Sequence, residues 1–214
     1  MRNPGMLFLG LAVLCVPFPV VAEEIHADVW ADNWFALYVD GNLVKEDHVP
    51  ITTERSFNRE SFGFSTERPF VLAIIAKDFK QDDSGLEYIG TRRQQMGDGG
   101  LIAQFVSGNS VVAVTDSGWR CMVAHEAPTD KACERQRDPV PGKGPCGFVE
   151  TPEPAGWKEA GFDDSAWSPA HEYAASQVGP KDGYDEVRWQ RGAKLIWGPD
   201  LKTSNTILCR LQVD

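Results

Sequence analysis

The stretch WFALYVDG, residues 34–41, decides the fold class of this chain. Its first six residues are aromatic or aliphatic, and most of them are side chains that strands favour. Asp40 and Gly41 form the kind of pair that a two-residue hairpin prefers, because its tight turn needs positive φ angles. Leu43 and Val44 then begin the returning strand. This pattern predicts a β-hairpin.

A second stretch, FVLAIIA at residues 70–76, is apolar at all seven positions. It is shorter than an ordinary helix and rich in aliphatic side chains, which together favour a strand. A strand with one solvated face would alternate apolar and polar residues, and this one does not. We therefore expect residues 70–76 to form a strand that is buried on both faces.

The rest of the chain consists of short strand patterns separated by turns. We expect further strands at residues 24–31, 61–66, 101–106, 111–114, 119–123, 172–178, 194–197 and 206–213, and a long polar loop at residues 81–100. No window holds the 3.6-residue period of a surface helix, so no long helix is expected. The chain is therefore predicted to be all-β, an antiparallel β-sandwich of roughly eight or more strands.

The N-terminus has the features of a signal peptide. Arg2 supplies a positive charge, residues 6–16 are apolar, and small residues precede Glu23. This pattern predicts cleavage after about Ala22 and a secreted or periplasmic protein. The apolar stretch is too short to span a membrane, and no later segment is apolar enough. We expect one β-sandwich domain at residues 23–214.

The charge balance excludes one class of partner. The chain has 21 Lys and Arg against 31 Asp and Glu, a formal net charge of −10, and no basic cluster. Binding to phosphates needs a positive surface. We therefore expect no nucleic-acid partner.

Cysteines indicate disulfide bonds. Cys15 leaves with the predicted signal peptide, and the mature chain keeps Cys121, Cys133, Cys146 and Cys209. An even number of cysteines in an exported protein indicates disulfides. Of the three possible pairings we favour Cys121–Cys209 together with Cys133–Cys146. Residues 121–155 are expected to form an irregular excursion that contains the second disulfide. A zinc site is the alternative, although the chain has no C-x-x-C pair and no His at finger spacing.

Four segments, in order, resemble the galactose-binding-like jelly-roll domains of secreted bacterial glycosidases. They are ADNWFALYVDG at 31–41, FVLAIIAKD at 70–78, GGLIAQ at 99–104 with TDSGW at 115–119, and GW at 156–157 with GFDDSAW at 161–167 and LIW at 195–197. The resemblance covers residues 25–213 and implies a jelly roll that stands here without its usual catalytic partner. It also implies that Trp119, Trp167 and Trp197 lie in the core, and it assigns no place to Trp30.

The resemblance, together with the predicted signal peptide, the aromatic content and the absence of a catalytic motif, predicts an exported, non-catalytic module that binds a carbohydrate or another extracellular ligand. Two alternatives stay open, namely an assembly subunit that docks on another exported protein and a small hydrolase. Catalysis lacks a recognisable motif, because the four His are scattered and no G-x-S-x-G is present. The pairs at residues 82–83 and 163–164 are adjacent carboxylates, which cannot flank a substrate as glycosidase acids do. We therefore assign no catalytic residue, and expect His125 and His171 to be exposed.

Tryptophans are the candidate ligand-binding residues, because aromatic rings stack on the apolar faces of sugars. The candidates are Trp34, Trp157 and Trp189, with Arg188 and Arg191 beside Trp189 to bind hydroxyl groups. Burial in the core is the alternative for each ring.

An oxygen-rich loop, DGYDE at residues 182–186, suits a hard cation. Asp182 and Asp185 are the candidate ligands of a structural calcium ion, although the loop lacks the EF-hand pattern. A solvated loop without an ion is the alternative. No other cofactor is expected.

Overall fold

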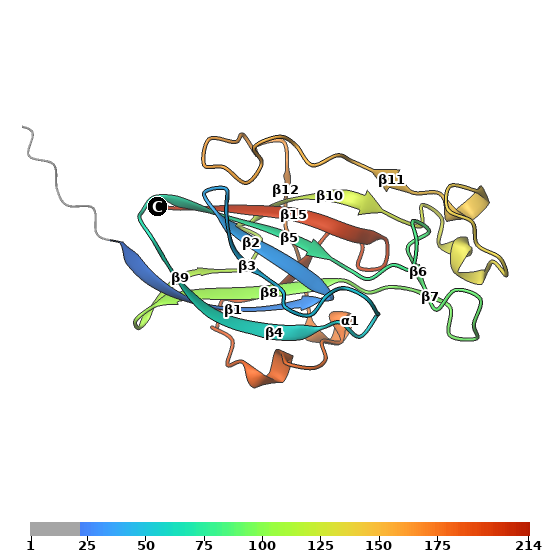
Figure 1. Cartoon of the computed structure of the whole chain (residues 1–214), viewed down its shortest axis with the longest axis horizontal. Coiled ribbons are helices and arrows are strands. Elements are labelled where there is room, and N and C mark those ends of the chain that lie inside the picture. The colour runs from blue at the N-terminus through green and yellow to red at the C-terminus, as the bar shows by residue number, and fades with distance from the viewer. Residues whose placement is uncertain (1–21) are drawn as a thin grey trace, which may run out of the picture.

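A computed structural model describes residues 22–214, and the predicted signal peptide up to residue 21 lies outside the described residues. The chain forms two antiparallel sheets packed face to face (Figure 1). The first consists of β1 (Glu23–Asp32), β4 (Asn58–Thr66), β8 (Gly100–Ser107), β9 (Ser110–Val114), β13 (His171–Tyr173) and β14 (Leu195–Trp197). Its order is β13-β14-β8-β1-β4, and β9 also pairs with β8.

The second sheet has the order β11-β10-β15-β5-β2-β3, and β12 also pairs with β10. Its strands are β2 (Trp34–Val39), β3 (Asn42–Glu46), β5 (Phe70–Lys77), β10 (Arg120–Glu126), β11 (Val149–Glu150), β12 (Ser168–Pro169) and β15 (Ser204–Val213). A small separate hairpin joins β6 (Leu86–Glu87) and β7 (Gln95–Met96). The predicted all-β sandwich is confirmed, and its architecture is consistent with a jelly roll.

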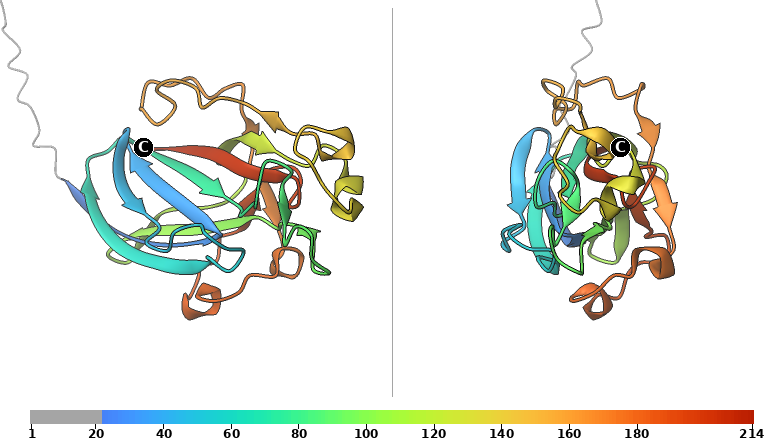
Figure 2. Two further views of the ribbon diagram at one scale, coloured as in Figure 1. Left: turned by 45° about the vertical axis from the view of Figure 1, so that its right-hand side comes forward. Right: turned by 90° about the vertical axis from the view of Figure 1, so that its right-hand side faces the viewer.

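The core lies between the sheets and follows the two-residue period of strands. On β1, Ile25, Ala27, Val29 and Ala31 point inward and are fully or almost fully buried. Of the three predicted core tryptophans, Trp119 and Trp197 lie in this core, whereas Trp167 is buried in a separate cluster. Trp30, which had no predicted place, is buried in a third cluster. The short helical elements lie outside the sandwich (Figure 2); they are α1 (Ala175–Val178), η1 (Lys131–Arg135), η2 (Gly144–Cys146) and η3 (Tyr184–Glu186).

The local predictions have mixed outcomes. The hairpin at residues 40–41 is confirmed, with φ angles of 46° and 82°, and β2 pairs with β3. The strand predicted at residues 172–178 is wrong beyond Tyr173, because residues 175–178 form α1, which ends at Gly179 in the left-handed conformation. The loop predicted at residues 81–100 contains the β6–β7 hairpin.

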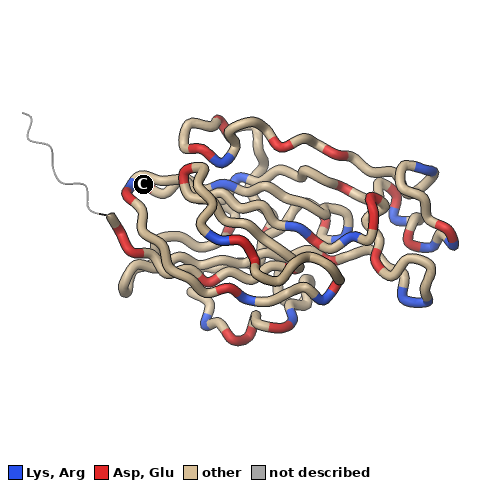
Figure 3. The backbone as a smooth tube through the Cα atoms, viewed as in Figure 1, with Lys and Arg blue, Asp and Glu red and all other residues tan. Residues whose placement is uncertain are grey.

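Both favoured disulfides are confirmed. Cys121 and Cys209 face each other on β10 and β15, and Cys133 joins Cys146 between η1 and η2. Two disulfides suit an oxidising compartment. Within the described residues, no helix has the length and apolar character needed to span a membrane. Lys and Arg are scattered among Asp and Glu along the described chain (Figure 3).

β5 is buried on both faces, as predicted, because a long segment covers the outside of its sheet. Phe70, Leu72 and Ile74 face the core between the sheets. Ala73 and Ile75 face the other way and pack beneath side chains of residues 157–167, above all Trp157 and Trp167. In Figure 1 this covering segment runs along the outside of β10 and β15.

One buried cation fixes this covering segment. Arg210 lies on β15, and its side chain is 3% exposed. Its Nε donates to Asp164 Oδ2 over 2.9 Å, and its terminal nitrogens donate to the backbone carbonyls of Trp157, Glu159 and Phe162. A buried charge is tolerated when it is paired and fully hydrogen-bonded. Arg210 therefore ties residues 157–164 to the sheet they cover.

We predict that Arg210→Met lowers the free energy of unfolding by about 3 kcal/mol, since it leaves Asp164 and three carbonyls without their donor. Arg120 is the matched control, because it faces Arg210 across the β10–β15 ladder and is exposed. Arg120→Met should change stability by less than about 0.5 kcal/mol. Urea unfolding of both variants checks this, and equal stability of the two would show that Arg210 does not fix the covering segment.

Candidate functional site: a polar cleft at one end of the sandwich

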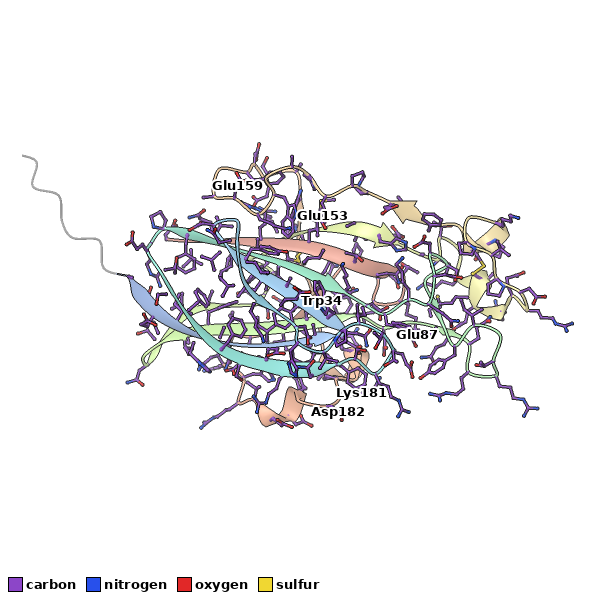
Figure 4. All side chains as sticks on the ribbon, in the orientation of Figure 1. Trp34, Glu87, Glu153, Glu159, Lys181 and Asp182 are labelled. Atoms are coloured by element: carbon purple, nitrogen blue, oxygen red, sulfur yellow. A yellow bond between two sulfur atoms is a disulfide. The ribbon has the colours of Figure 1, made fainter. Side chains whose placement is uncertain are left out.

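A cleft of about 390 Å³ opens where three loops meet at one end of the sandwich. Glu54, Arg55 and Phe57 come from the loop between β3 and β4. The β6–β7 hairpin and the residues after it supply Glu87, Tyr88, Arg93, Gln95 and Asp98, and the segment between α1 and η3 supplies Lys181 and Asp182. Figure 4 shows Glu87, Lys181 and Asp182 in this region, away from Glu153 and Glu159.

Tyr88 organises the outer part of the cleft. Its φ angle is 52°, a conformation that side chains other than glycine rarely adopt and that is over-represented at functional sites. Its hydroxyl donates to Glu54 and accepts from Arg93 Nη2 over 2.7 Å. The Arg93 guanidinium lies 4.1 Å from the centre of the Tyr88 ring. The hydrogen bond from Tyr88 holds the pKa of Glu54 below its usual range.

Glu87, Asp98 and the cation Lys181 also line the cleft. Glu87 is 3% exposed and accepts a hydrogen bond from Gln95 Nε2 over 2.8 Å. Burial raises the pKa of Glu87 and the pKa of Asp98. The charge of Lys181 acts in the opposite direction on both, and its Nζ lies 4.9 Å from the centre of the Phe57 ring. Acceptors and donors thus line the same cleft.

Two further carboxyl groups lie deeper. Asp32, at the end of β1, is 2% exposed, and Asp78, just after β5, is 3% exposed. Asp32 Oδ2 and both Asp78 oxygens have no hydrogen-bond partner among the described residues. Burial, with the charge of Asp98 second, raises the pKa of Asp32 to about 8. Burial also raises the pKa of Asp78, and Asp32 adds to that effect.

A disulfide-linked loop supports the hairpin that carries the cleft. The Cys133–Cys146 pair packs with Leu86 and Met96 in one small buried cluster. Gln94 Nε2 donates to the carbonyls of Glu134 and Gln136 over 2.9 and 2.8 Å. The irregular excursion is therefore part of the structure that positions Glu87 and Tyr88.

The sequence-predicted tryptophans do not line this cleft. Trp34 lies on β2, half-buried, with Lys77 Nζ 4.9 Å from its ring centre (Figure 4). Trp157 is 2% exposed and donates from Nε1 to Glu153 Oε2 over 2.9 Å. Both belong to the cluster under the covering segment. The burial of Trp157 leaves no open ring face for a sugar.

Trp189 lies on the opposite face of the sandwich from Trp34 and Trp157, packed against the cluster that contains Trp30. Its ring is half-buried and packs 5.8 Å from that of Tyr184, and its Nε1 donates to the Tyr184 carbonyl over 3.1 Å. Arg188 and Arg191 are exposed beside it. The structure thus keeps Trp189 and its two arginines together but apart from Trp34 and Trp157.

The candidate calcium ligands lie near the cleft rim. The Asp182 backbone carbonyl accepts a hydrogen bond from Trp30 Nε1 over 3.0 Å. Both Asp182 and Asp185 are exposed. Among the described residues, neither belongs to a trio of His, Cys, Asp or Glu whose ligand atoms lie within 4.8 Å of one another. Calcium binding by this loop stays a prediction.

The prediction that His125 is exposed is wrong, because its side chain is buried. His171 is exposed, as expected. The His125 ring stacks on Phe148 with a centroid distance of 5.8 Å, and Nδ1 lies 3.1 Å from Asn205 Oδ1. Burial lowers the pKa of His125. The aromatic partner comes from the excursion, so the sequence around His125 carried no sign of its burial.

A second hollow, of about 410 Å³, lies over β10 and is mostly apolar. Met122, Pro154, Trp167, Pro169 and Pro199 contribute to its walls, and His171 is the single titratable side chain that lines it. The end cleft holds many more polar groups with fixed partners. It is therefore the better candidate for binding a polar ligand.

The residues of the end cleft, apart from Asp182, were missed by sequence reasoning. They come from separate loops, and only the polar composition of residues 81–100 hinted at them. Comparisons with protein-family models, with curated proteins and with solved structures find no match for this chain. Any function of the cleft must therefore be inferred from its chemistry.

We predict that Asp32→Asn stabilises the protein increasingly as pH rises from 4 to 8. Because the pKa of Asp32 is about 8 in the folded chain, well above the ordinary value of an aspartate, the unfolded chain loses this proton first, and rising pH then favours unfolding. One pKa unit is worth roughly 1.4 kcal/mol. At pH 7 the variant should gain at least about 1 kcal/mol, or roughly 3 °C in Tm.

Thermal melts in EDTA across this pH range measure the gain, and the exposed Asp185→Asn serves as its control. An Asp32→Asn effect that is equal at pH 4 and pH 8 would contradict the raised pKa.

We also predict that replacing Cys133 and Cys146 together by Ala lowers stability by about 3 kcal/mol, as expected for a disulfide that closes a short loop. Hydrogen exchange should accelerate first at residues 86–96, which pack on this disulfide. The Cys121→Ala/Cys209→Ala pair, which spans 88 residues, should instead loosen β10 and β15. Unchanged exchange at residues 86–96 would mean that the loop does not support the hairpin.

Proposed function

We propose that this protein is an exported binding module that holds a carbohydrate in the end cleft. The observation that carries the proposal is the meeting of fixed acceptors, fixed donors and aromatic rings in one cleft of about 390 Å³. Sugar hydroxyls both donate and accept, so they can use carboxylates and cations together. A site built of such groups selects ligands strongly, because a ligand without hydroxyls leaves its polar groups unpaired.

The arrangement of the cleft supports this assignment. Glu87 and Asp98 are acceptors, and Lys181, Arg93 and Gln95 are donors, from loops on a rigid sandwich. Binding residues are commonly presented in this way. Tyr88 adds a half-buried ring beside them. The resemblance to galactose-binding-like domains, whose relatives serve glycosidases, points to the same class of ligand.

The charged side chains that line the cleft restrict the class of sugar that we expect it to bind. The cleft walls carry the acids Glu54, Glu87, Asp98 and Asp182 and the bases Arg55, Arg93 and Lys181. Asp32 and Asp78 lie behind them, and burial raises the pKa of both, so they add little negative charge at neutral pH. The walls carry no excess of bases, so they offer no net positive charge to a uronic or sulfated sugar. Neutral sugars or amino sugars are the expected ligands.

A glycan array followed by calorimetry tests the proposal. We expect selective binding of neutral or amino sugars, and a loss of affinity of about tenfold or more, equal to ~1.4 kcal/mol, in Glu87→Gln and in Lys181→Ala. Arg191→Ala is the control, because Arg191 is exposed outside the cleft.

Two results would overturn the proposal. Binding lost in Arg191→Ala but kept in Lys181→Ala would place the site at Trp189 instead. No binding to any glycan would leave the assembly-subunit hypothesis, which a pull-down against exported proteins then addresses.

A further inference from the structure

A second cluster of polar side chains lies at the base of the loop between β3 and β4. Asp47 and His48 are the first residues after β3, and Glu60 lies near the start of β4. A carboxylate oxygen of Asp47, a ring nitrogen of His48 and a carboxylate oxygen of Glu60 all lie within 4.8 Å of one another. No other group of this kind occurs among residues 22–214. None of the three residues lines the end cleft.

Asp47 is the member of the trio that has a buried oxygen without a hydrogen-bond partner among the described residues. It is 5% exposed, and its Oδ1 accepts from the Val49 backbone N–H over 2.9 Å. Its Oδ2 is buried and has no hydrogen-bond partner in the described part of the chain. A buried carboxylate oxygen without a partner is costly, so a ligand that pairs with it gains that free energy.

Glu60 and His48 complete the arrangement. Lys45 Nζ holds Glu60 Oε2 at 2.9 Å, while Oε1 faces His48 Nδ1 and accepts a hydrogen bond from Asn58 Nδ2 over 3.3 Å. The His48 backbone N–H also donates to Oε1, over 3.0 Å. The His48 side chain is 68% exposed, so it can turn and the trio is open to solvent on that side. Two carboxylates against one lysine leave a negative charge at the trio.

We propose that Asp47, His48 and Glu60 bind a divalent first-row transition cation, for which Zn²⁺ is the probe. Imidazole nitrogen with carboxylate oxygen suits zinc, and open zinc sites commonly have three protein ligands with water in the fourth position. Zinc–ligand bonds of about 2.1 Å place tetrahedral ligand atoms roughly 3.4 Å apart. The three ligand atoms lie within 4.8 Å of one another, and rotation of the exposed His48 side chain adjusts the position of its ring nitrogen to this spacing.

The position gives the cation a structural effect. The loop at residues 47–57 starts at this trio and carries Glu54, Arg55 and Phe57 to the end cleft. A cation that joins Asp47 and His48 to Glu60 ties the start of the loop to β4. The metal site rests on its own geometry and does not depend on a carbohydrate in the cleft.

Titration of the purified, untagged protein with Zn²⁺ tests the site, with Co²⁺ absorption as a second reading of the ligand field. We expect saturable binding of one equivalent, weakened at least about tenfold in His48→Ala and in Asp47→Asn. His171→Ala is the matched control, because His171 is also exposed but lies on β13. It should bind as the unaltered protein does.

Limited trypsin digestion gives an independent reading. Zn²⁺ should slow cleavage after the exposed Arg55 in the unaltered protein but not in His48→Ala, while cleavage after Arg188 stays the same. Absence of saturable Zn²⁺ binding, or binding in His48→Ala equal to that of the unaltered protein, would overturn the site. Glycan binding is measured separately, so loss of one proposal leaves the other standing.

Discussion

The buried guanidinium of Arg210 is the interaction on which the arrangement of the sandwich depends. The sheet that contains β5 is apolar on its outer face, so it needs a cover, and the segment at residues 157–167 has few apolar side chains besides Trp157 and Trp167. Arg210 adds four hydrogen bonds to that segment from inside the sheet. Its neighbour Cys209 points to the opposite face and bonds Cys121. One strand thus joins the core, the adjacent strand and the cover.

Because both faces of this sheet are covered by apolar side chains, the buried polar groups without partners in the described part of the chain lie at one end of the sandwich. Asp32 and Asp78 lie at strand ends, where β1 and β5 leave the core. Their unpaired oxygens oppose folding, as does the left-handed conformation of Tyr88. These features that oppose folding lie around one cleft, and features of this kind are over-represented at functional sites.

Those parts of the fold that depend on short stretches could be predicted from the sequence. The hairpin at Asp40 follows from local φ preferences, and the doubly buried β5 follows from an unbroken apolar run. The cleft could not be predicted, because Glu54, Glu87 and Lys181 lie on different loops and only the fold brings them together. For the same reason Trp157, a candidate binding residue from the sequence, is buried: nothing near it in the sequence reveals the sheet face that covers it.

The loop at residues 47–57 links the two proposed sites. Ordering a flexible loop costs conformational entropy, and a ligand in the cleft that contacts Glu54 must meet that cost if the loop is free. A cation held by Asp47, His48 and Glu60 would meet part of it beforehand at the other end of the loop. Coupling of this kind is reciprocal. If both proposed ligands bind and both order the loop, each would strengthen the binding of the other by the same factor, although the two share no contact.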